Sequence, residues 1–468
     1  MDALLKKFNE NRIDTKFNIL QRASIEQDYK FDEHFSVDLK DYDSCGQYYK
    51  FYQTRLRVLK ERTRNQCLKK WDAGFKLNGK TVVEKKKVLD IQANQPCWCI
   101  GTIYCEMKYK PNVLEEVVND TYGAPDLLKS YTDPDGTDEI MLEDESGRVL
   151  LVGDFLQSTP FVTGTVVGLL GMEAEAGTFQ ILDICYPSEV PQKEYQVPTS
   201  DEEKYIALVS GLNVSTNNPE NLIKLQLLQE LLMGRLQNEK SISNIGKLLI
   251  CGGSIDPSKN NSNSQKTMES LITFGNFLGN TLQSLPISIM PSTSDPSDKA
   301  LPQRPFNKIL FSELLKPYFA DISRDLLHLA TNPSIYEFNG IRILATSGEN
   351  ISDICRYVIP GNSSENESKL NSVEHRLDLM ECTLKWQNVA PTIPDTLWAY
   401  PFIDKDPFIL NEMPHVYIAG NQPRFGTRDI ELYNKKVKLI CLPEFNKSSS
   451  LVTLNLKTLM VEKMDIKI

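Results

Sequence analysis

Five short apolar runs in the second half of the chain, each followed directly by a turn rich in small polar residues, constrain the fold more than any other feature. The runs are 206–209, 248–250, 287–290, 341–345 and 415–419. Helical patterns lie between and around them, at 219–236, 268–285, 305–318, 324–330, 351–358 and 373–388. Strands that alternate with helices in this way form layered, largely parallel sheets. The sequence therefore predicts an α/β sandwich.

The turns follow the order of the metal-binding loops of a two-metal phosphoesterase, but they lack the metal ligands. Such enzymes hold two ions with loops of the forms DxH, GDxxD, GNHD, a single His and GHxH. The residues at the corresponding positions are Gly211, Asn213, Gly253, Thr293, Ser294, Ser347, Asn421 and Pro423. Glycine has no donor atom, and a hydroxyl is a poor ligand unless it is deprotonated. We therefore predict that these loops bind no metal, hold no cofactor and catalyse no reaction.

A working metallophosphoesterase with unusual ligands is a second hypothesis, because three carboxylates lie near these turns. They are Asp256, Asp295 and Asp298. Two divalent ions need more anionic or imidazole donors than three aspartates on two loops provide. None of the four histidines falls at a ligand position; they are His34, His328, His375 and His415. We disfavour this hypothesis, which the metal content of the purified protein would test.

The overall composition limits the classes of function. The chain has 468 residues, of which 41% are hydrophobic, and a net charge of −10. An acidic protein is a poor candidate for one whose main work is to hold a phosphate backbone. No apolar run approaches the length of a membrane span, and the first residues lack the apolar core of a signal peptide. We expect an intracellular protein without a membrane contact.

The residues before the sandwich have a different pattern, made of short β-type runs. The runs lie at 88–91, 97–106, 139–142, 148–153, 162–170 and 178–185. This number of short strands fits a small barrel such as an OB fold. The stretch 111–138 interrupts them and is interpreted as an insertion with a short helix at 113–118. The predicted division is a mobile, polar arm at 1–44, a helix and OB-fold domain at 45–190, and an inactive phosphoesterase-like domain at 191–468.

A helix is predicted from residue 48 to about residue 74, and one side of it is basic. The basic residues are Arg55, Arg57, Arg62, Arg64, Lys69 and Lys70. A basic helix face can bind nucleic acid, but a run of charge is more often a solvated face. We favour the solvated face here, and we interpret the basic run at 84–87 in the same way.

Three cysteines of the predicted barrel, Cys97, Cys99 and Cys105, raise the possibility of a metal site. Structural zinc sites usually present pairs of cysteines across a turn, two to four residues apart. Cys97 and Cys99 instead alternate within a strand, and no fourth ligand is near in the sequence. We predict that these are reduced cysteines of a hydrophobic core.

Aromatic residues and a methionine in the barrel and its insertion form the candidate partner-binding set. They are Trp98, Tyr104, Met107, Tyr109 and Tyr122. Aromatics of an OB barrel can stack on the bases of a single strand. Because acidic residues are frequent from 133 to 154, we favour a surface that binds protein over one that binds DNA, and we expect these side chains to be exposed.

Four stretches carry a resemblance to a known family. They are QPCWCIGTIYCEMKY at 95–109, EIMLEDESGRVLLVGD at 139–154, VGLLGMEAEAG at 167–177 and WQNVAPTIPDTLWAYP at 386–401. The chain resembles the B subunits of replicative DNA polymerases, in the delta branch found in yeasts, over nearly its whole length from about Gly46. The resemblance implies an OB domain followed by an inactivated calcineurin-like phosphoesterase domain.

The resemblance also implies a non-catalytic, nuclear scaffold for DNA replication and repair. In that family the subunit binds the cysteine-rich C-terminal domain of the catalytic subunit and the N-terminal domain of a third subunit. The catalytic subunit of polymerase zeta is a further implied partner. The alternative function is a single-strand DNA-binding module that acts through the OB barrel, although the acidic balance predicts weak DNA contact at most.

Overall fold

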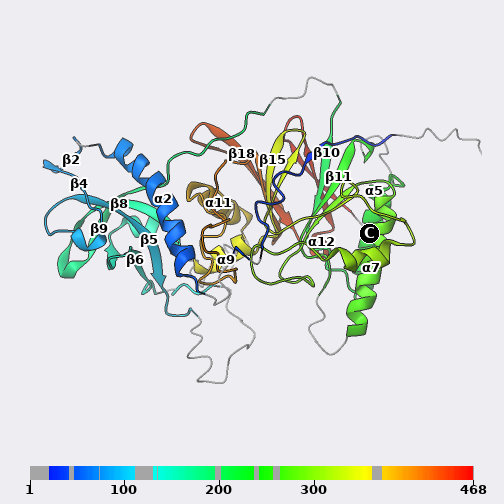
Figure 1. Cartoon of the computed structure of the whole chain (residues 1–468), viewed down its shortest axis with the longest axis horizontal. Coiled ribbons are helices and arrows are strands. Elements are labelled where there is room, and N and C mark those ends of the chain that lie inside the picture. Colours follow the sequence, from blue (N-terminus) through cyan, green and yellow to red (C-terminus); the bar gives the residue numbers. More distant parts are fainter. Residues whose placement is uncertain are drawn as a thin grey trace, which may run out of the picture.

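The computed structural model describes residues 21–38, 40–41, 47–72, 74–110, 130–133, 135–195, 202–236, 242–256, 264–360 and 372–466. The molecule is elongated, with a β-barrel at one end and a sandwich of two sheets at the other (Figure 1). A long helix, α2 (Tyr49–Lys70), lies between them. No helix within the described ranges is long and apolar enough to cross a membrane.

The sandwich contains two six-stranded sheets. The first sheet has the order β13 (Leu327–Leu329), β12 (Ile287–Met290), β11 (Ile245–Cys251), β10 (Tyr205–Val209), β19 (Ser450–Asn455) and β20 (Val461–Asp465). The second has the order β1 (Gln27–Asp28), β14 (Ser334–Phe338), β15 (Ile341–Thr346), β16 (Val416–Gln422), β18 (Lys435–Pro443) and β17 (Gly426–Leu432). Strands β10 to β13 are parallel, as are β15, β16 and β18. The predicted α/β sandwich is therefore confirmed, although 324–330, predicted to be helical, contains β13.

Helices cover the outer face of each sheet. The first sheet carries α5 (Pro219–Leu232), α7 (Ser264–Leu282) and α8 (Lys308–Leu315), and the second carries α9 (Glu349–Tyr357) and α11 (Val373–Lys385). The short α12 (Phe445–Ser448) follows β18. Alternate side chains of a strand point to opposite faces, so Leu208 packs between the two sheets while Ala207 and Val209 pack under the helices. Both faces of the central strands are buried, which explains their unbroken apolar runs.

The barrel is closed by a single sheet. Its strands are β4 (Val83–Glu84), β5 (Cys97–Glu106), β6 (Glu139–Glu143), β7 (Arg148–Val152), β9 (Phe179–Cys185) and β8 (Val166–Glu173), in that order. The barrel closes because β5 also pairs with β8. Four smaller elements flank it, β2 (Lys76–Leu77), β3 (Lys80–Thr81), α4 (Phe155–Ser158) and the 3₁₀ turn η2 (Glu175–Gly177).

The predicted strand at 88–91 is wrong. This segment forms a 3₁₀ turn, η1 (Val88–Asp90). The carboxylate of Asp144 accepts a hydrogen bond from the backbone N–H of Val88 at 2.9 Å, so a side chain rather than a neighbouring strand satisfies this donor. The predicted helix at 113–118 lies outside the described residues.

The cysteines predicted to be core residues, Cys97, Cys99 and Cys105, are all buried in the barrel. Burial raises the pKa of the Cys97 thiol to about 11 and that of the Cys105 thiol to about 12. A buried thiol is more weakly acidic because the low-dielectric interior disfavours the thiolate. The prediction of core cysteines is confirmed.

Helix α2 is present as predicted, but one of its basic residues is not on the solvated face. Arg55 is 1% exposed, and its Nε lies 2.6 Å from Oδ2 of Asp406 in the sandwich. Its Nη1 also donates to the carbonyl oxygen of Pro391 at 2.7 Å. Arg55 therefore joins the helix to the sandwich, and its assignment to a solvated face is wrong.

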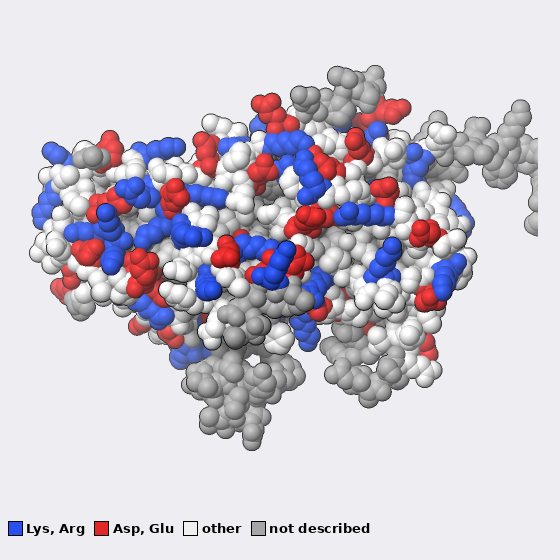
Figure 2. All heavy atoms as spheres, viewed as in Figure 1, with Lys and Arg blue, Asp and Glu red and all other residues white. Residues whose placement is uncertain are grey.

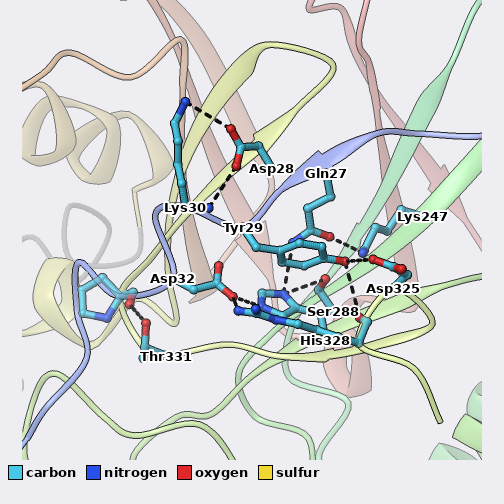
Figure 3. A network of polar contacts seen from close by, with 12 residues as sticks. Gln27, Asp28, Tyr29, Lys30, Asp32, Lys247, Ser288, Asp325, His328 and Thr331 are labelled. Atoms are coloured by element: carbon cyan, nitrogen blue, oxygen red, sulfur yellow. Dashed lines mark hydrogen bonds and ion pairs between the residues drawn. The ribbon is translucent and has the colours of Figure 1, made fainter.

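The predicted mobile arm is wrong for residues 21–38, which pack on the sandwich; residues 1–20 lie outside the described part. Strand β1 pairs with β14 at the edge of the second sheet, and Phe35 is buried. Figure 3 shows the polar contacts of this segment with the first sheet. Gln27 accepts a hydrogen bond from Lys247 on β11, and Asp32 Oδ2 lies 2.6 Å from Nε2 of His328 on β13. The segment thus connects both sheets.

Candidate functional site

Loops from both sheets meet at one edge of the sandwich. Gly252 follows β11, and a Cβ atom added to it would lie 2.6 Å from Cβ of Ser347 and 2.9 Å from Cβ of Ser292. Ser347 follows β15 of the second sheet, whereas Ser292 follows β12 of the first. Real Cβ atoms do not approach so closely, so the loops can meet only because this residue is glycine. The edge is where the predicted phosphoesterase-like turns come together.

The side chain of Asn421 lies against two glycines, Gly211 and Gly253, which the sequence analysis assigns to aspartate positions. A Cβ atom on Gly211 or on Gly253 would lie 2.8 Å from Oδ1 of Asn421. The amide is held in place because its Nδ2 donates to the carbonyl oxygen of Ser347 at 2.9 Å. Both glycines also have a left-handed φ, +62° and +67°, which favours glycine. The Asn421 side chain therefore leaves no room for a larger side chain at either glycine.

Asp295 is the buried carboxylate of this edge. Its oxygens accept hydrogen bonds from the backbone N–H groups of Gly253, Ser254, Ile255 and Ser292 at 2.8 to 3.0 Å, and from Oγ of Ser292 at 2.9 Å. Burial raises the pKa of Asp295 to about 6, although these donors oppose the shift. All five donors come from the β11 and β12 loops. The geometry indicates a structural carboxylate that holds these two loops together.

The other two carboxylates of the metallophosphoesterase hypothesis do not join Asp295. Asp256 and Asp298 are both exposed. Oδ2 of Asp298 instead accepts a hydrogen bond from the hydroxyl of Tyr400 at 3.0 Å. Within the described residues there is no group of three or more His, Cys, Asp or Glu side chains placed to hold a metal ion.

The structure brings together only part of the predicted former metal site. Gly211, Gly253, Ser347 and Asn421 meet, as described above. Ser294 touches the cluster through its hydroxyl, 2.8 Å from that of Ser292. The side chains of the remaining three residues do not enter the cluster. Thr293 and Pro423 are exposed. The backbone N–H of Asn213 donates to the carbonyl oxygen of Gly253 at 2.7 Å, but its side chain is directed to Glu444, whose Oε2 is 3.4 Å from Nδ2.

Two residues of the edge were missed by sequence reasoning. Oδ1 of Asn332 accepts a hydrogen bond from the backbone N–H of Ser347 at 3.0 Å. Oε1 of Glu349 accepts one from the backbone N–H of Thr293 at 2.8 Å. Glu349 lies in the first turn of α9, where an acidic residue is favoured, and this signal could have been used. No comparable signal marks Asn332.

The expected exposure of the candidate partner-binding set is wrong for two of its members. Trp98 is 2% exposed and Met107 is 5% exposed. The ring of Trp98 packs against that of Trp71, with 6.2 Å between the centroids, because α2 covers this side of the barrel. Tyr104 is half-buried and Tyr109 is 43% exposed. Tyr122 lies outside the described residues.

Comparison with known proteins places the chain in a family. The family model described as DNA polymerase delta subunit OB-fold domain matches residues 47–184, and the one described as the B subunit of DNA polymerase alpha/epsilon matches residues 206–427. The DNA polymerase delta small subunit of Saccharomyces cerevisiae is 55% identical over 100% of both chains. The chain belongs to the DNA polymerase delta small-subunit family. The resemblance seen in the sequence is therefore confirmed.

More distant members of the family also match this chain over most of its length. The DNA polymerase delta small subunit of Arabidopsis thaliana is 36% identical over 80% of this chain and 82% of its own length. DNA polymerase delta subunit 2 of Drosophila melanogaster is 31% identical over 96% of this chain and 97% of its own length. The matched OB-fold domain coincides with the barrel, and the alpha/epsilon match begins at the first strand of the sandwich after the barrel. The predicted architecture, an OB-fold barrel before an α/β sandwich, is confirmed, and the phosphoesterase-like character of the sandwich stays a prediction.

Proposed function

We propose that this chain is a non-catalytic accessory subunit of DNA polymerase delta, acting in the nucleus in DNA replication and repair. The observation that carries the proposal is the 55% identity to a polymerase delta small subunit along the full length of both chains. In this role the chain links the cysteine-rich C-terminal domain of the catalytic subunit to the N-terminal domain of a third subunit. The catalytic subunit of polymerase zeta is a further partner in the proposal.

The proposal includes the loss of phosphoesterase chemistry at the loop edge. Two-metal hydrolysis requires carboxylates and imidazoles that converge on a pair of ions. Asn421 fills the space beside Gly211 and Gly253, and Asp295 is fully engaged with backbone donors. This packing supports a fold kept for its surface rather than for catalysis.

The absence of phosphoesterase chemistry is tested by metal analysis and by assay. The purified chain is dialysed against Mn²⁺, freed of unbound ions and analysed for metal, and its hydrolysis of bis-p-nitrophenyl phosphate is measured. We expect far less than one ion per chain and no hydrolysis above that of buffer. About two ions per chain together with hydrolysis would contradict this part of the proposal.

The accessory role is tested by co-expression with the cysteine-rich C-terminal domain of the polymerase delta catalytic subunit, followed by size-exclusion chromatography in 1 M salt. We expect a stoichiometric complex that survives the salt, because stable subunit interfaces have a large apolar core. Separation of the two folded proteins would contradict the role. The same experiment with the polymerase zeta domain tests the further partner.

A further inference from the structure

Two basic segments that the sequence analysis interpreted separately as solvated faces line one groove. The groove lies between α2 and the barrel, with a volume of about 1000 Å³. Helix α2 contributes Lys50, Arg57, Lys60 and Arg64, and the segment before η1 contributes Lys85, Lys86 and Lys87. Figure 2 shows Lys and Arg side chains on the surface over α2 and the barrel, interspersed with Asp and Glu. The fold thus combines charges that are separated along the chain into one surface.

Most of these cations are not neutralised by neighbours. Arg64 is paired with Glu84, at 2.6 and 2.9 Å, and Lys85 donates to Oε1 of Gln95 at 3.0 Å. Among the residues that the structure describes, no carboxylate lies within 4.0 Å of the charged groups of four others, which are Lys50, Arg57, Lys86 and Lys87. Seven cationic residues line the groove, against four acidic ones. The groove is therefore basic on a chain whose net charge is −10.

A second, smaller cavity of about 340 Å³ continues the groove at the N-terminal end of α2. The two share Gln53, Leu56 and Glu145 in their linings. Three tyrosines contribute to its walls, Tyr49, Tyr52 and Tyr104. Tyr49 is 71% exposed, and Tyr104 lies under the guanidinium of Arg148, 4.3 Å from the ring centroid. Tyrosine and arginine are enriched at the energetically important positions of protein interfaces.

Charge distribution favours a polypeptide over a nucleic acid as the occupant. Two carboxylates of the smaller cavity are already paired, Glu143 with Arg148 at 2.8 Å and Asp395 with Lys110 at 2.5 Å. The carboxylate of Glu145, which lines both the groove and the cavity, would repel a phosphate backbone that continued out of the basic groove. The aromatic side chain in the basic half, Trp98, is 2% exposed and offers no platform for a base. A polypeptide can present carboxylates to the basic half and an apolar side chain to the tyrosines.

We propose that this groove binds an acidic segment of a partner subunit, with carboxylates facing Arg57, Lys60 and Lys86 and an apolar side chain entering the cavity beside Tyr52 and Tyr104. The inference rests on the proposed function, since the partner is another subunit of the polymerase. It adds a specific surface, which includes Tyr104 of the original partner-binding set but neither Trp98 nor Met107.

Photo-crosslinking tests the occupant directly. Lys60→p-benzoylphenylalanine is incorporated into the chain, the complex with the catalytic and third subunits is assembled on a labelled primer-template, and the sample is irradiated. We expect a crosslink to an acidic segment of one subunit, identified by mass spectrometry. A crosslink to DNA, or none to either partner, would overturn the proposal. Lys316→p-benzoylphenylalanine, directly after α8 and outside the groove, is the control and should give no such product.

Charge reversal provides a second test that separates this inference from the accessory role. We expect the variant R57E/K60E to bind the crosslinked subunit at least about tenfold more weakly and with a smaller salt dependence. The R57K variant keeps the charge and should bind like the unmodified chain. If R57E/K60E binds with unchanged affinity, the groove proposal fails while the accessory role stands. If the unmodified chain forms no complex, the accessory role itself fails.

Discussion

At the scale of single residues, Asp353 shows how a buried carboxyl group affects stability. It lies buried on α9 and accepts hydrogen bonds from the hydroxyls of Thr392 and Thr396 at 2.5 and 2.6 Å. Burial raises the pKa of Asp353 to about 6, from an unfolded value of 3.8. Between these values the folded state holds a proton that the unfolded state has lost. The contribution of Asp353 to stability therefore falls as pH rises through this window.

The variant D353N should remove this dependence, because an amide does not ionise. Relative to the unmodified chain, we expect its free energy of unfolding to improve by about 2 kcal/mol between pH 4 and pH 7. Urea denaturation at both pH values measures the difference. D90N, at an exposed position, is the control for the loss of one carboxylate from the chain. An equal pH dependence in D353N and the unmodified chain would contradict the account.

Gly253 tests whether the loop edge still has room for a metal ligand. We expect G253D to lower the free energy of unfolding by about 3 kcal/mol, from backbone strain at φ +67° and overlap with Asn421. G79D isolates the strain, because Gly79 has φ +80° with nothing within 4 Å of its Cβ position. G79D should lower the free energy of unfolding by only about 1 kcal/mol. Thermal melts of G253D and G79D, with and without Mn²⁺, measure the two losses. If Mn²⁺ stabilised G253D, the space beside Asn421 would have room for a metal site, which would contradict the account.

At the scale of elements, the joint between α2 and the sandwich depends on a buried ion pair, Arg55 with Asp406. Removal of one partner leaves an uncompensated buried charge, so R55M should cost about 3–5 kcal/mol of unfolding free energy. The double variant R55M/D406L should recover most of the lost stability, because well-packed apolar residues can replace a buried ion pair. Urea denaturation of both variants tests this. An equal loss of stability in R55M and R55M/D406L would show that the unpaired charge of Asp406 is not the cause of the loss.

An exposed ion pair on the same helix provides the comparison for this joint. Arg64 and Glu84 are 50% and 25% exposed in their side chains. Solvent screens such a pair, so R64M should cost less than about 1 kcal/mol. A loss as large as that of R55M would show that burial does not set the difference.

The arm makes a testable contribution through β1 and Asp32. Deletion of residues 1–33 leaves β14 as an open sheet edge and removes the contacts of Asp32 with His328 and of Gln27 with Lys247. We expect a lower melting temperature and more light scattering on heating, because open edges promote association. Deletion of residues 1–20 keeps these contacts, so it should change neither the melting temperature nor the light scattering. Identical behaviour of the two truncated chains would contradict a role for the segment.

The sequence allowed correct prediction of those elements whose burial requires apolar residues. The central strands were predictable because both faces are apolar, and β5 (Cys97–Glu106) was predicted with its observed bounds. The docked arm could not be predicted, because its contacts are polar and one of them joins residues 296 positions apart, Asp32 and His328. Trp98 and Arg55 were misplaced for a related reason. The periodicity of apolar residues shows which side of a helix or strand faces its own core. It does not show whether another part of the chain covers the opposite side.

At the scale of the whole molecule, the barrel and the sandwich share one chain and are joined by α2 and a connector, while the arm packs on the sandwich. The proposed boundary near residue 190 stays a prediction. The connector packs on the sandwich, where Nε2 of Gln192 donates to the carbonyl oxygen of Pro414 at 3.1 Å. The basic groove between helix and barrel is the surface that we propose for a partner. It agrees with the proposed accessory role, in which the chain holds other subunits together.

The most direct test of this role is the mass of the complexes formed by three purified proteins, the polymerase delta catalytic subunit, the third subunit and this chain. Native mass spectrometry is performed on the mixture with and without this chain. We predict a 1:1:1 complex when it is present, and no complex between the other two subunits when it is absent. A stable pair of catalytic and third subunits without this chain would contradict the account.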